Sequence, residues 1–116
     1  MESTNNTNAL EALVIVENVT ETEKHFTLKM GDIHPNFNHN LIGVIEEEEP
    51  GNFYAMYANE LYSDHKPEEK YFSTFEAARA WVLQKITSDV KWTLEVTNKY
   101  RVYPPVIRPE ILKAIG

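Results

Sequence analysis

An amphipathic stretch in the second half of the chain constrains the fold more than any other feature. The segment Tyr71–Ile86, YFSTFEAARAWVLQKI, carries Ser73 at an N-cap position and Glu76 three residues later, and this S-x-x-E spacing favours a capping box. At about 100° per residue, the apolar side chains fall on one stripe, flanked by Trp81: Phe75, Ala78, Val82 and Ile86. We therefore predict a helix over 73–86 whose apolar side is covered by strands.

Four segments before this helix predict strands. Ala12–Val19 is short, apolar and β-branched, which favours a buried strand, and His25–Met30 alternates between apolar and polar side chains, so the two predict a hairpin. Leu41–Ile45 and Asn52–Ala58 predict a second hairpin that folds about Pro50-Gly51. Strands that precede the main helix favour an antiparallel sheet over a doubly wound parallel one.

The second hairpin brings a run of glutamates next to aromatic side chains. Folding about Pro50-Gly51 places Glu48 opposite Phe53 and Glu47 opposite Tyr54. Because a two-residue type II turn matches the twist of paired strands poorly, we also expect a longer loop or a bulge at this tip.

The chain after the main helix admits two interpretations. Asp89–Thr97 alternates strictly between apolar and polar residues, which predicts a further strand. The alternative is a second helix that starts at Ser88, because Trp92, Val96 and Tyr100 keep i, i+4 spacing.

These elements define a single α+β domain. We predict a mostly antiparallel sheet of about four to six strands, with the helix over 73–86 packed on one face and a short C-terminal helix over Pro109–Ile115. The polar segment Asn59–Lys70 is expected to connect the second hairpin to the main helix. Residues 1–9 are small and polar and predict a disordered tail, so the folded domain spans residues 10–116.

Composition excludes several classes of protein. The 116 residues include no cysteine, which removes disulfides, thiol catalysis and cysteine-ligated metals. The four glycines lie too far apart in the sequence to form a G-x-G-x-x-G turn or a P-loop, so neither phosphate-binding motif is present. No apolar run approaches the roughly 20 residues of a membrane span, and the polar N-terminus lacks the apolar core of a secretory signal. We therefore expect a cytoplasmic protein without a membrane span.

No set of side chains can be given catalytic roles. Asp32, His34 and His39 share one loop, but their spacing matches no zinc pattern. Ser63-Asp64-His65 contains the residue types of a hydrolase triad, but neighbours in sequence do not converge with the required geometry. We therefore expect no catalytic residue, no metal site and no cofactor, and predict a protein that is not an enzyme.

Charge is distributed unevenly along the chain. The net charge is −7, and residues 1–69 carry 14 acidic and 3 basic side chains whereas residues 70–116 carry 4 acidic and 8 basic ones. The overall sign disfavours direct binding of nucleic acid, which needs clustered lysines and arginines against phosphates.

The acidic hairpin tip is the candidate partner-binding site. Carboxylates beside aromatic rings can meet a basic surface and supply contact area at low entropic cost, and the residues are Glu46, Glu47, Glu48, Glu49, Phe53 and Tyr54. The alternative is a solvated hairpin end whose glutamates keep an edge strand from pairing with other chains.

A basic and aromatic C-terminal third provides a second candidate. Contact with single-stranded nucleic acid, with bases stacked on rings, would use Lys91, Lys99, Tyr100 and Arg101. The competing interpretation places Trp92 in the core and leaves the lysines in solvent.

These features predict a small acidic, non-enzymatic module that binds a basic surface of a partner protein. Proteins of this size and charge include phage-encoded inhibitors of host defence systems and immunity proteins that block nucleases, some of which mimic nucleic acid; the analogy is one of size and charge. One alternative is a nucleic-acid-associated protein that uses the C-terminal third. Another is a structural or assembly subunit that forms homo-oligomers through unpaired strand edges.

Overall fold

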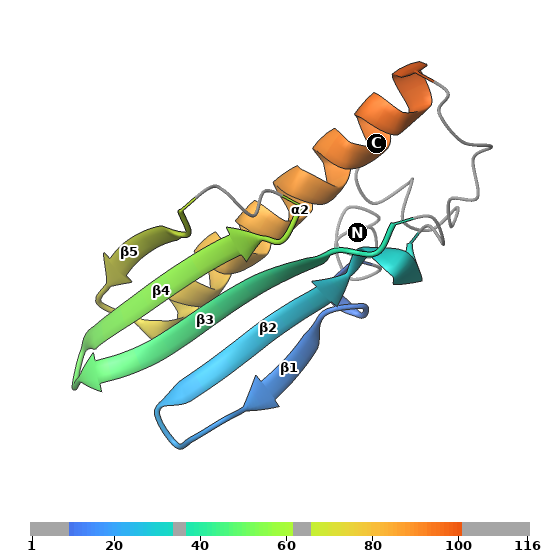
Figure 1. Cartoon of the computed structure of the whole chain (residues 1–116). Helices are drawn as coiled ribbons and strands as arrows, with labels where there is room; N and C mark the ends of the chain where they lie inside the picture. Colours follow the sequence, from blue (N-terminus) through green and yellow to red (C-terminus); the bar gives the residue numbers. More distant parts are fainter. Residues whose placement is uncertain (1–9, 34–36, 62–65, 101–116) are drawn as a thin grey trace, which may run out of the picture.

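The computed structural model describes residues 10–33, 37–61 and 66–100. In this part of the chain five strands form one sheet in the order β1-β2-β3-β4-β5, and a long helix crosses it (Figure 1). The elements are β1 Ile15–Asn18, β2 Glu23–Lys29, the 3₁₀ helix η1 Met30–Asp32, β3 Asn40–Glu49, β4 Asn52–Asn59, β5 Glu68–Phe72 and α2 Phe75–Tyr100.

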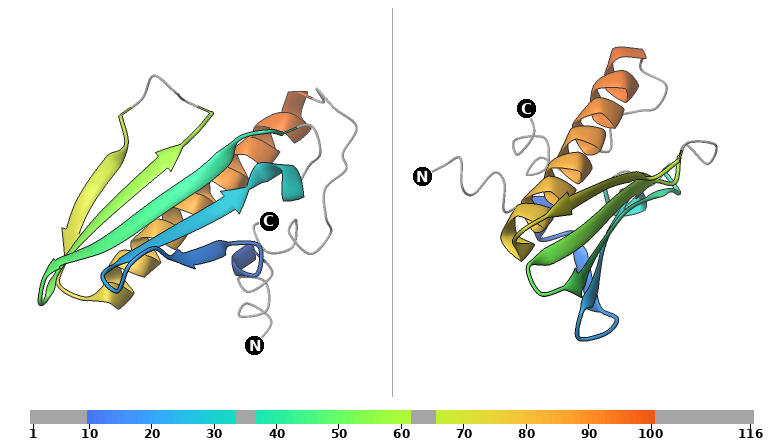
Figure 2. Two further views of the ribbon diagram at one scale, coloured as in Figure 1. Left: turned by 60° about the horizontal axis from the view of Figure 1, so that its bottom comes forward. Right: turned by 90° about the vertical axis from the view of Figure 1, so that its left-hand side faces the viewer.

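The predicted α+β fold class is confirmed. Each strand pairs antiparallel with the next one along the chain, and the five strands fall within the expected number. Figure 2 shows α2 packed against one side of the sheet. Among the described residues, no helix combines the length and the apolar character needed to cross a membrane.

The core lies between the sheet and α2. Every fourth residue of the helix is buried, and these residues are Ala78, Val82, Ile86, Val90 and Leu94. They face β2, β3 and β4, whose buried side chains include Phe26, Leu28, Leu41, Ile45 and Ala55. Removal of this apolar surface from water is the main favourable term in folding.

Gly43 allows the helix to approach the middle of β3. A Cβ atom at this position would lie 2.3 Å from Val82 Cγ1, which is closer than any real Cβ contact. The missing side chain therefore sets the distance between the sheet and α2 at this point.

The opposite side of the sheet is not covered by any described element. Along β3, Leu41 and Ile45 point towards α2 and are buried, whereas Ile42, Val44 and Glu46 point away and are partly exposed. Both views in Figure 2 show this second side without a helix. We call the side of the sheet that points away from α2 the open face.

The predicted strand over Asp89–Thr97 is wrong, because α2 extends from Phe75 to Tyr100. Val90 and Leu94 continue the four-residue stripe of the helix and are 0% and 3% exposed. The apparent alternation arises because Trp92 lies on the exposed side of the same helix. The alternative prediction of a helix is correct for this segment. The segment does not form a second helix, however, because it continues the helix of residues 75–88.

The predicted helix start is wrong by one residue. Thr74 Oγ1 accepts a hydrogen bond from the Ala77 N–H at 3.1 Å, so Thr74 and not Ser73 is the N-cap. Glu76 then lies one position too early for the reciprocal bond of a capping box, and the predicted box does not form.

Two strands differ from the prediction. The predicted buried strand over Ala12–Val19 is wrong in its bounds and its burial, because β1 spans Ile15–Asn18 and all four of its residues are exposed. Strand β5 was not predicted. Glu68–Phe72 falls partly in the polar segment that was expected to be a connection, yet it pairs with β4 from Phe53↔Phe72 to Tyr57↔Glu68. The predicted tail over residues 1–9 and the predicted helix over Pro109–Ile115 lie outside the described residues.

Candidate functional site

The glutamate run belongs to β3 itself and not to a loop. Glu46–Glu49 forms the last part of the strand, and the chain then reverses through Pro50-Gly51, where Gly51 has a φ of 78°. Glycine adopts this left-handed conformation without the steric cost that other residues carry. The acidic residues are therefore held by the ladder of the hairpin.

A bulge at Glu48 changes the register of this hairpin. Glu49 lies opposite Asn52, but beyond the bulge Glu47 lies opposite Phe53 and Glu46 opposite Tyr54. The expected bulge is confirmed, whereas the expected pairing of Glu48 with Phe53 and of Glu47 with Tyr54 is wrong by one residue. The reason is that the extra residue of a bulge has no partner in the ladder.

The alternation of side chains along β3 and β4 divides the predicted site between the two sides of the sheet. Glu46 and Tyr54 lie on the open face, whereas Glu47 and Phe53 point towards the start of α2. Glu48 and Glu49 are exposed at the tip. The predicted residues therefore do not form one site, because they are separated into two groups on opposite sides of the sheet.

On the open face, a row of acidic and tyrosine side chains crosses four strands. The register aligns Glu23 of β2, Glu46 of β3, Tyr54 of β4 and Tyr71 of β5. We call these four residues the acid–tyrosine row. Its Glu23 carboxylate pairs with the His25 Nε2 atom at 2.5 Å.

The two tyrosines of the row are held by carboxylates. The Tyr54 and Tyr71 ring centroids lie 5.5 Å apart, and the Tyr54 hydroxyl donates a hydrogen bond of 2.7 Å to Glu69 Oε1. This hydrogen bond, with a smaller contribution from burial, raises the pKa of Tyr54 to about 12. Desolvation and then the charge of the nearby Glu48 carboxylate raise the pKa of Tyr71. Both tyrosines therefore stay neutral at physiological pH.

The glutamates at the hairpin tip keep their negative charge unpaired within the described residues. The ion pairs there join Glu11 to Arg79 and Glu68 to Lys85, the Glu23 carboxylate lies within hydrogen-bond distance of His25, and none of these contacts involves Glu46–Glu49. Glu23 and Glu46 even lie directly opposite one another on neighbouring strands. Like charges in that position destabilise a sheet.

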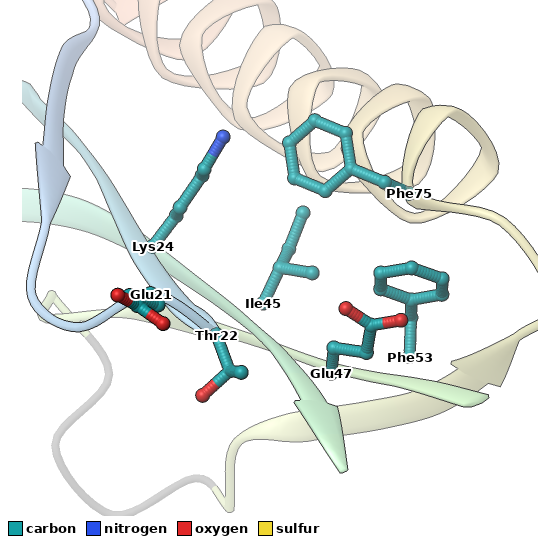
Figure 3. A pocket seen from close by; sticks show the side chains of 7 residues that line it. All are labelled: Glu21, Thr22, Lys24, Ile45, Glu47, Phe53 and Phe75. Atoms are coloured by element: carbon teal, nitrogen blue, oxygen red, sulfur yellow. The ribbon is translucent and has the colours of Figure 1, made fainter. Parts of the chain in front are cut away.

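On the other side of the hairpin, Glu47 and Phe53 line a pocket of about 220 Å³ (Figure 3). Its lining residues come from the β1–β2 turn, the three central strands and the first turn of α2, and are Glu21, Thr22, Lys24, Ile45, Glu47, Phe53 and Phe75. We call it the Phe53–Phe75 pocket. The two phenylalanine rings meet edge to face with centroids 6.3 Å apart.

A separate polar cluster lies at the far end of β3 and β4. His39 is 7% exposed, and its Nε2 atom has no hydrogen-bond partner. Burial lowers the pKa of His39, although the charges of Glu60 and Asp89 act in the opposite direction. Asp89 on α2 accepts hydrogen bonds from the Tyr57 hydroxyl at 2.7 Å and from Asn59 Nδ2 at 3.1 Å.

The metal site considered for Asp32, His34 and His39 falls partly outside the described residues. Within the described parts of the chain, no group of three or more histidine, aspartate or glutamate side chains could hold a metal ion. His34 lies outside these parts. The arrangement around His39 connects β4 to α2 and is a structural feature of the core.

The residues of the nucleic-acid alternative are only partly described. Lys91 and Trp92 lie on the solvent side of α2, and Trp92 is 49% exposed, so the interpretation that placed it in the core is wrong. The backbone of Lys99 and Tyr100 belongs to α2, whereas Arg101 lies outside the described residues.

Several residues of the site were not found from the sequence. Glu69 and Tyr71 come from β5, whose sequence EEKYF shows no alternation of apolar and polar residues, so no local pattern marked this strand. Glu21, Lys24 and Phe75 reach the Phe53–Phe75 pocket only through the tertiary fold.

Comparisons with protein-family models, with curated proteins and with solved structures found no match for this chain.

Proposed function

We propose that the protein is a small, non-enzymatic binding module whose acidic end binds a basic surface of a partner protein. The observation that carries the proposal is the acid–tyrosine row on the open face, whose carboxylates lie in line with two tyrosines and form no ion pair with a lysine or arginine among the described residues. A cation from a partner would relieve the repulsion between Glu23 and Glu46, whose alignment is unfavourable in the isolated chain.

The tyrosines suit the centre of such an interface. Tyr54 and Tyr71 lie on neighbouring strands, and Tyr54 is further held by its hydrogen bond to Glu69. Tyrosines give a large contact area and lose little conformational entropy, because they have few rotatable bonds. Side chains placed on strands are positioned more accurately than side chains placed on loops.

The proposal extends to an inhibitory role. Proteins that bind phosphates typically carry a basic surface, and a row of carboxylates is complementary to such a surface. The module would therefore compete with a nucleic acid for the basic surface of its partner. Such binding is steered by charge and weakens as the salt concentration rises.

The test is a charge-neutral variant of the open face. The triple variant E46Q/E48Q/E69Q removes carboxylates around the two tyrosines but keeps the shape of the side chains. The control is E76Q/E95Q, which removes two carboxylates from the exposed side of α2. A photo-crosslinker at Tyr71, with one at Gln84 as the control position, identifies the partner. We expect crosslinks from position 71 that the triple variant reduces at least tenfold. Equal crosslinking and equal salt dependence in both variants would refute the proposal.

A second candidate function is association with single-stranded nucleic acid through α2. The exposed Trp92 beside Lys91 favours it, because an exposed aromatic ring can stack on a base. A gel-shift assay with single-stranded and double-stranded DNA and RNA at about 50 mM salt tests it. A complex that Trp92→Ala abolishes would support this function, and no complex under these conditions would eliminate it.

A further inference from the structure

The Phe53–Phe75 pocket has the size of a site for one side chain. Its volume of about 220 Å³ is below the roughly 300–1,000 Å³ of pockets that hold small-molecule ligands or cofactors. The pocket opens at the same hairpin as the acid–tyrosine row, since Glu46 and Glu47 are consecutive residues that point to opposite sides of β3. A partner that covers the hairpin therefore reaches both.

The walls of the pocket combine flat apolar surface with negative charge. Ile45 is 2% exposed and forms the floor, and the rings of Phe53 and Phe75 stand beside it (Figure 3). The carboxylates of Glu21 and Glu47 and the ammonium of Lys24 complete the lining. Two carboxylates and one ammonium leave a formal charge of −1, which one added cation would balance.

The pocket already shows that its aromatic wall accepts a cation. Lys24 Nζ lies 4.7 Å from the centroid of the Phe75 ring, within the range of a cation–π contact. This contact occupies the Phe75 ring and the ammonium group of Lys24. The Phe53 ring and the Glu47 carboxylate, which stand side by side in Figure 3, are left for another group.

The rim of the pocket is fixed by backbone hydrogen bonds. The Glu47 N–H donates to the Thr22 carbonyl oxygen at 2.9 Å, which joins the β1–β2 turn to β3. Thr20 Oγ1 accepts hydrogen bonds from the backbone N–H groups of Thr22 and Glu23 at 3.2 and 3.0 Å. The backbones that carry Glu21 and Glu47 are therefore held near each other before a partner arrives.

We propose that the Phe53–Phe75 pocket binds the side chain of one arginine from the partner protein. The inference rests on the proposed function and names the partner group that it requires. A guanidinium is planar and weakly hydrated, so it stacks on an aromatic ring and forms paired hydrogen bonds with a carboxylate at the same time. A lysine ammonium is a compact, strongly hydrated charge and gains less from the ring.

The experiment uses the full-length chain and two probe peptides, acetyl-Gly-Arg-Gly-amide and acetyl-Gly-Lys-Gly-amide, followed by NMR of the aromatic side chains. We expect the arginine peptide to shift the Phe53 and Phe75 signals with a Kd of about 1–10 mM, as one anchored side chain allows. The lysine peptide should bind at least threefold more weakly. Equal affinity for both peptides, or shifts confined to Tyr54 and Tyr71, would overturn the inference.

Two variants and a control locate the interaction. Glu47→Gln should weaken arginine binding at least threefold, and Phe53→Leu should remove the preference for arginine over lysine, while Glu76→Gln on the exposed side of α2 should change neither. Unchanged melting curves and unchanged methyl signals of Val82 show that each variant is folded. Undiminished arginine binding in folded Glu47→Gln and Phe53→Leu would refute the pocket as its site.

Failure of this inference can be told apart from failure of the proposed function. If the partner is lost with E46Q/E48Q/E69Q but retained at full affinity by Glu47→Gln and Phe53→Leu, the open face binds the partner and the pocket does not bind arginine. If neither set of variants changes partner binding, both proposals are wrong. Loss of the partner in both sets, with loss of the arginine preference, supports both.

Discussion

The two sides of the sheet differ in whether their charged side chains have partners within the fold. On the side of α2, lysines lie over aromatic rings: Lys24 over Phe75, Lys70 over Phe72 and Lys85 over Trp81, at 4.7, 5.5 and 5.6 Å from the ring centroids. On the open face, carboxylates gather around tyrosines, and those at the hairpin tip have no cation among the described residues. The covered side satisfies its cations within the fold, and the open face presents anions outward.

This difference is informative because the same strands build both sides. Alternate residues of β3 either pack in the core or meet solvent, so a short stretch serves both stability and recognition. Matched substitutions at neighbouring positions can therefore separate the two roles.

The largest difference is expected between two adjacent residues of β3. Leu41→Ala removes a fully buried side chain and should lower the free energy of unfolding by about 2–5 kcal/mol. Ile42→Ala, on the open face, should cost about 1 kcal/mol or less, because Ile42 is only partly buried. Denaturant unfolding of both variants measures the difference. Equal losses would mean that the open face is covered as fully as the other side.

Gly43→Ala should be the next most costly change. The new methyl group would overlap Val82, and such overpacking costs about 1–3 kcal/mol. In a Val82→Ala background the same substitution should cost less than about 1 kcal/mol, because the overlapping atoms are gone. A double-mutant cycle of unfolding free energies checks this. A cycle without coupling would show that the helix does not approach β3 as closely as described.

A smaller effect concerns pH and the buried His39. Burial lowers its pKa, so the unfolded chain binds a proton more readily than the folded chain as the pH falls through the ordinary value of about 6.5. Folding stability from this residue is thus present above that pH and is lost towards acid, with a slope of at most about 1.4 kcal/mol per pH unit. Unfolding free energies of the wild type and of His39→Gln between pH 7.5 and pH 5.5 test the prediction. The variant should lose less stability on acidification, and a parallel loss in both proteins would contradict it.

The smallest effect on stability is expected on the open face. Glu69→Gln removes the charged acceptor of the Tyr54 hydroxyl and should lower the pKa of Tyr54 from about 12 towards its ordinary value of about 10. The free energy of unfolding should change by less than about 0.5 kcal/mol, because the pair is exposed. NMR titration of ¹³C-labelled tyrosine rings follows the pKa directly. An unchanged Tyr54 pKa would show that the hydrogen bond to Glu69 is not formed in solution.

The features that sequence could predict depend on local periodicity. The stripe that begins at Ala78 identified the main helix, and the alternation in β2 and β3 identified the antiparallel sheet. The helix was predicted too short because Trp92 and Val96 also fit a strand pattern. Only the burial of Val90 and Leu94 against the sheet decides between the two periods.

The composition of the site could be predicted only in part. The glutamate run and Tyr54 are visible in the sequence, but the bulge at Glu48 decides which glutamate lies opposite which aromatic residue. A shift of one residue exchanges the two faces of a strand, and no local pattern sets it here. Glu69 and Tyr71 join the row through the pairing of β5, and Lys24 meets Phe75 across a long separation in sequence.

The bulge at Glu48 has a consequence for how the hairpin tolerates insertion and deletion. Glu49 pairs with Asn52 on one side of the bulge and Glu47 with Phe53 on the other, so a chain that lacks Glu48 would retain both of these pairs in an uninterrupted ladder. Bulges bend a strand and increase its twist. Loss of the single codon for Glu48 would therefore straighten β3 at this point and redirect the hairpin tip.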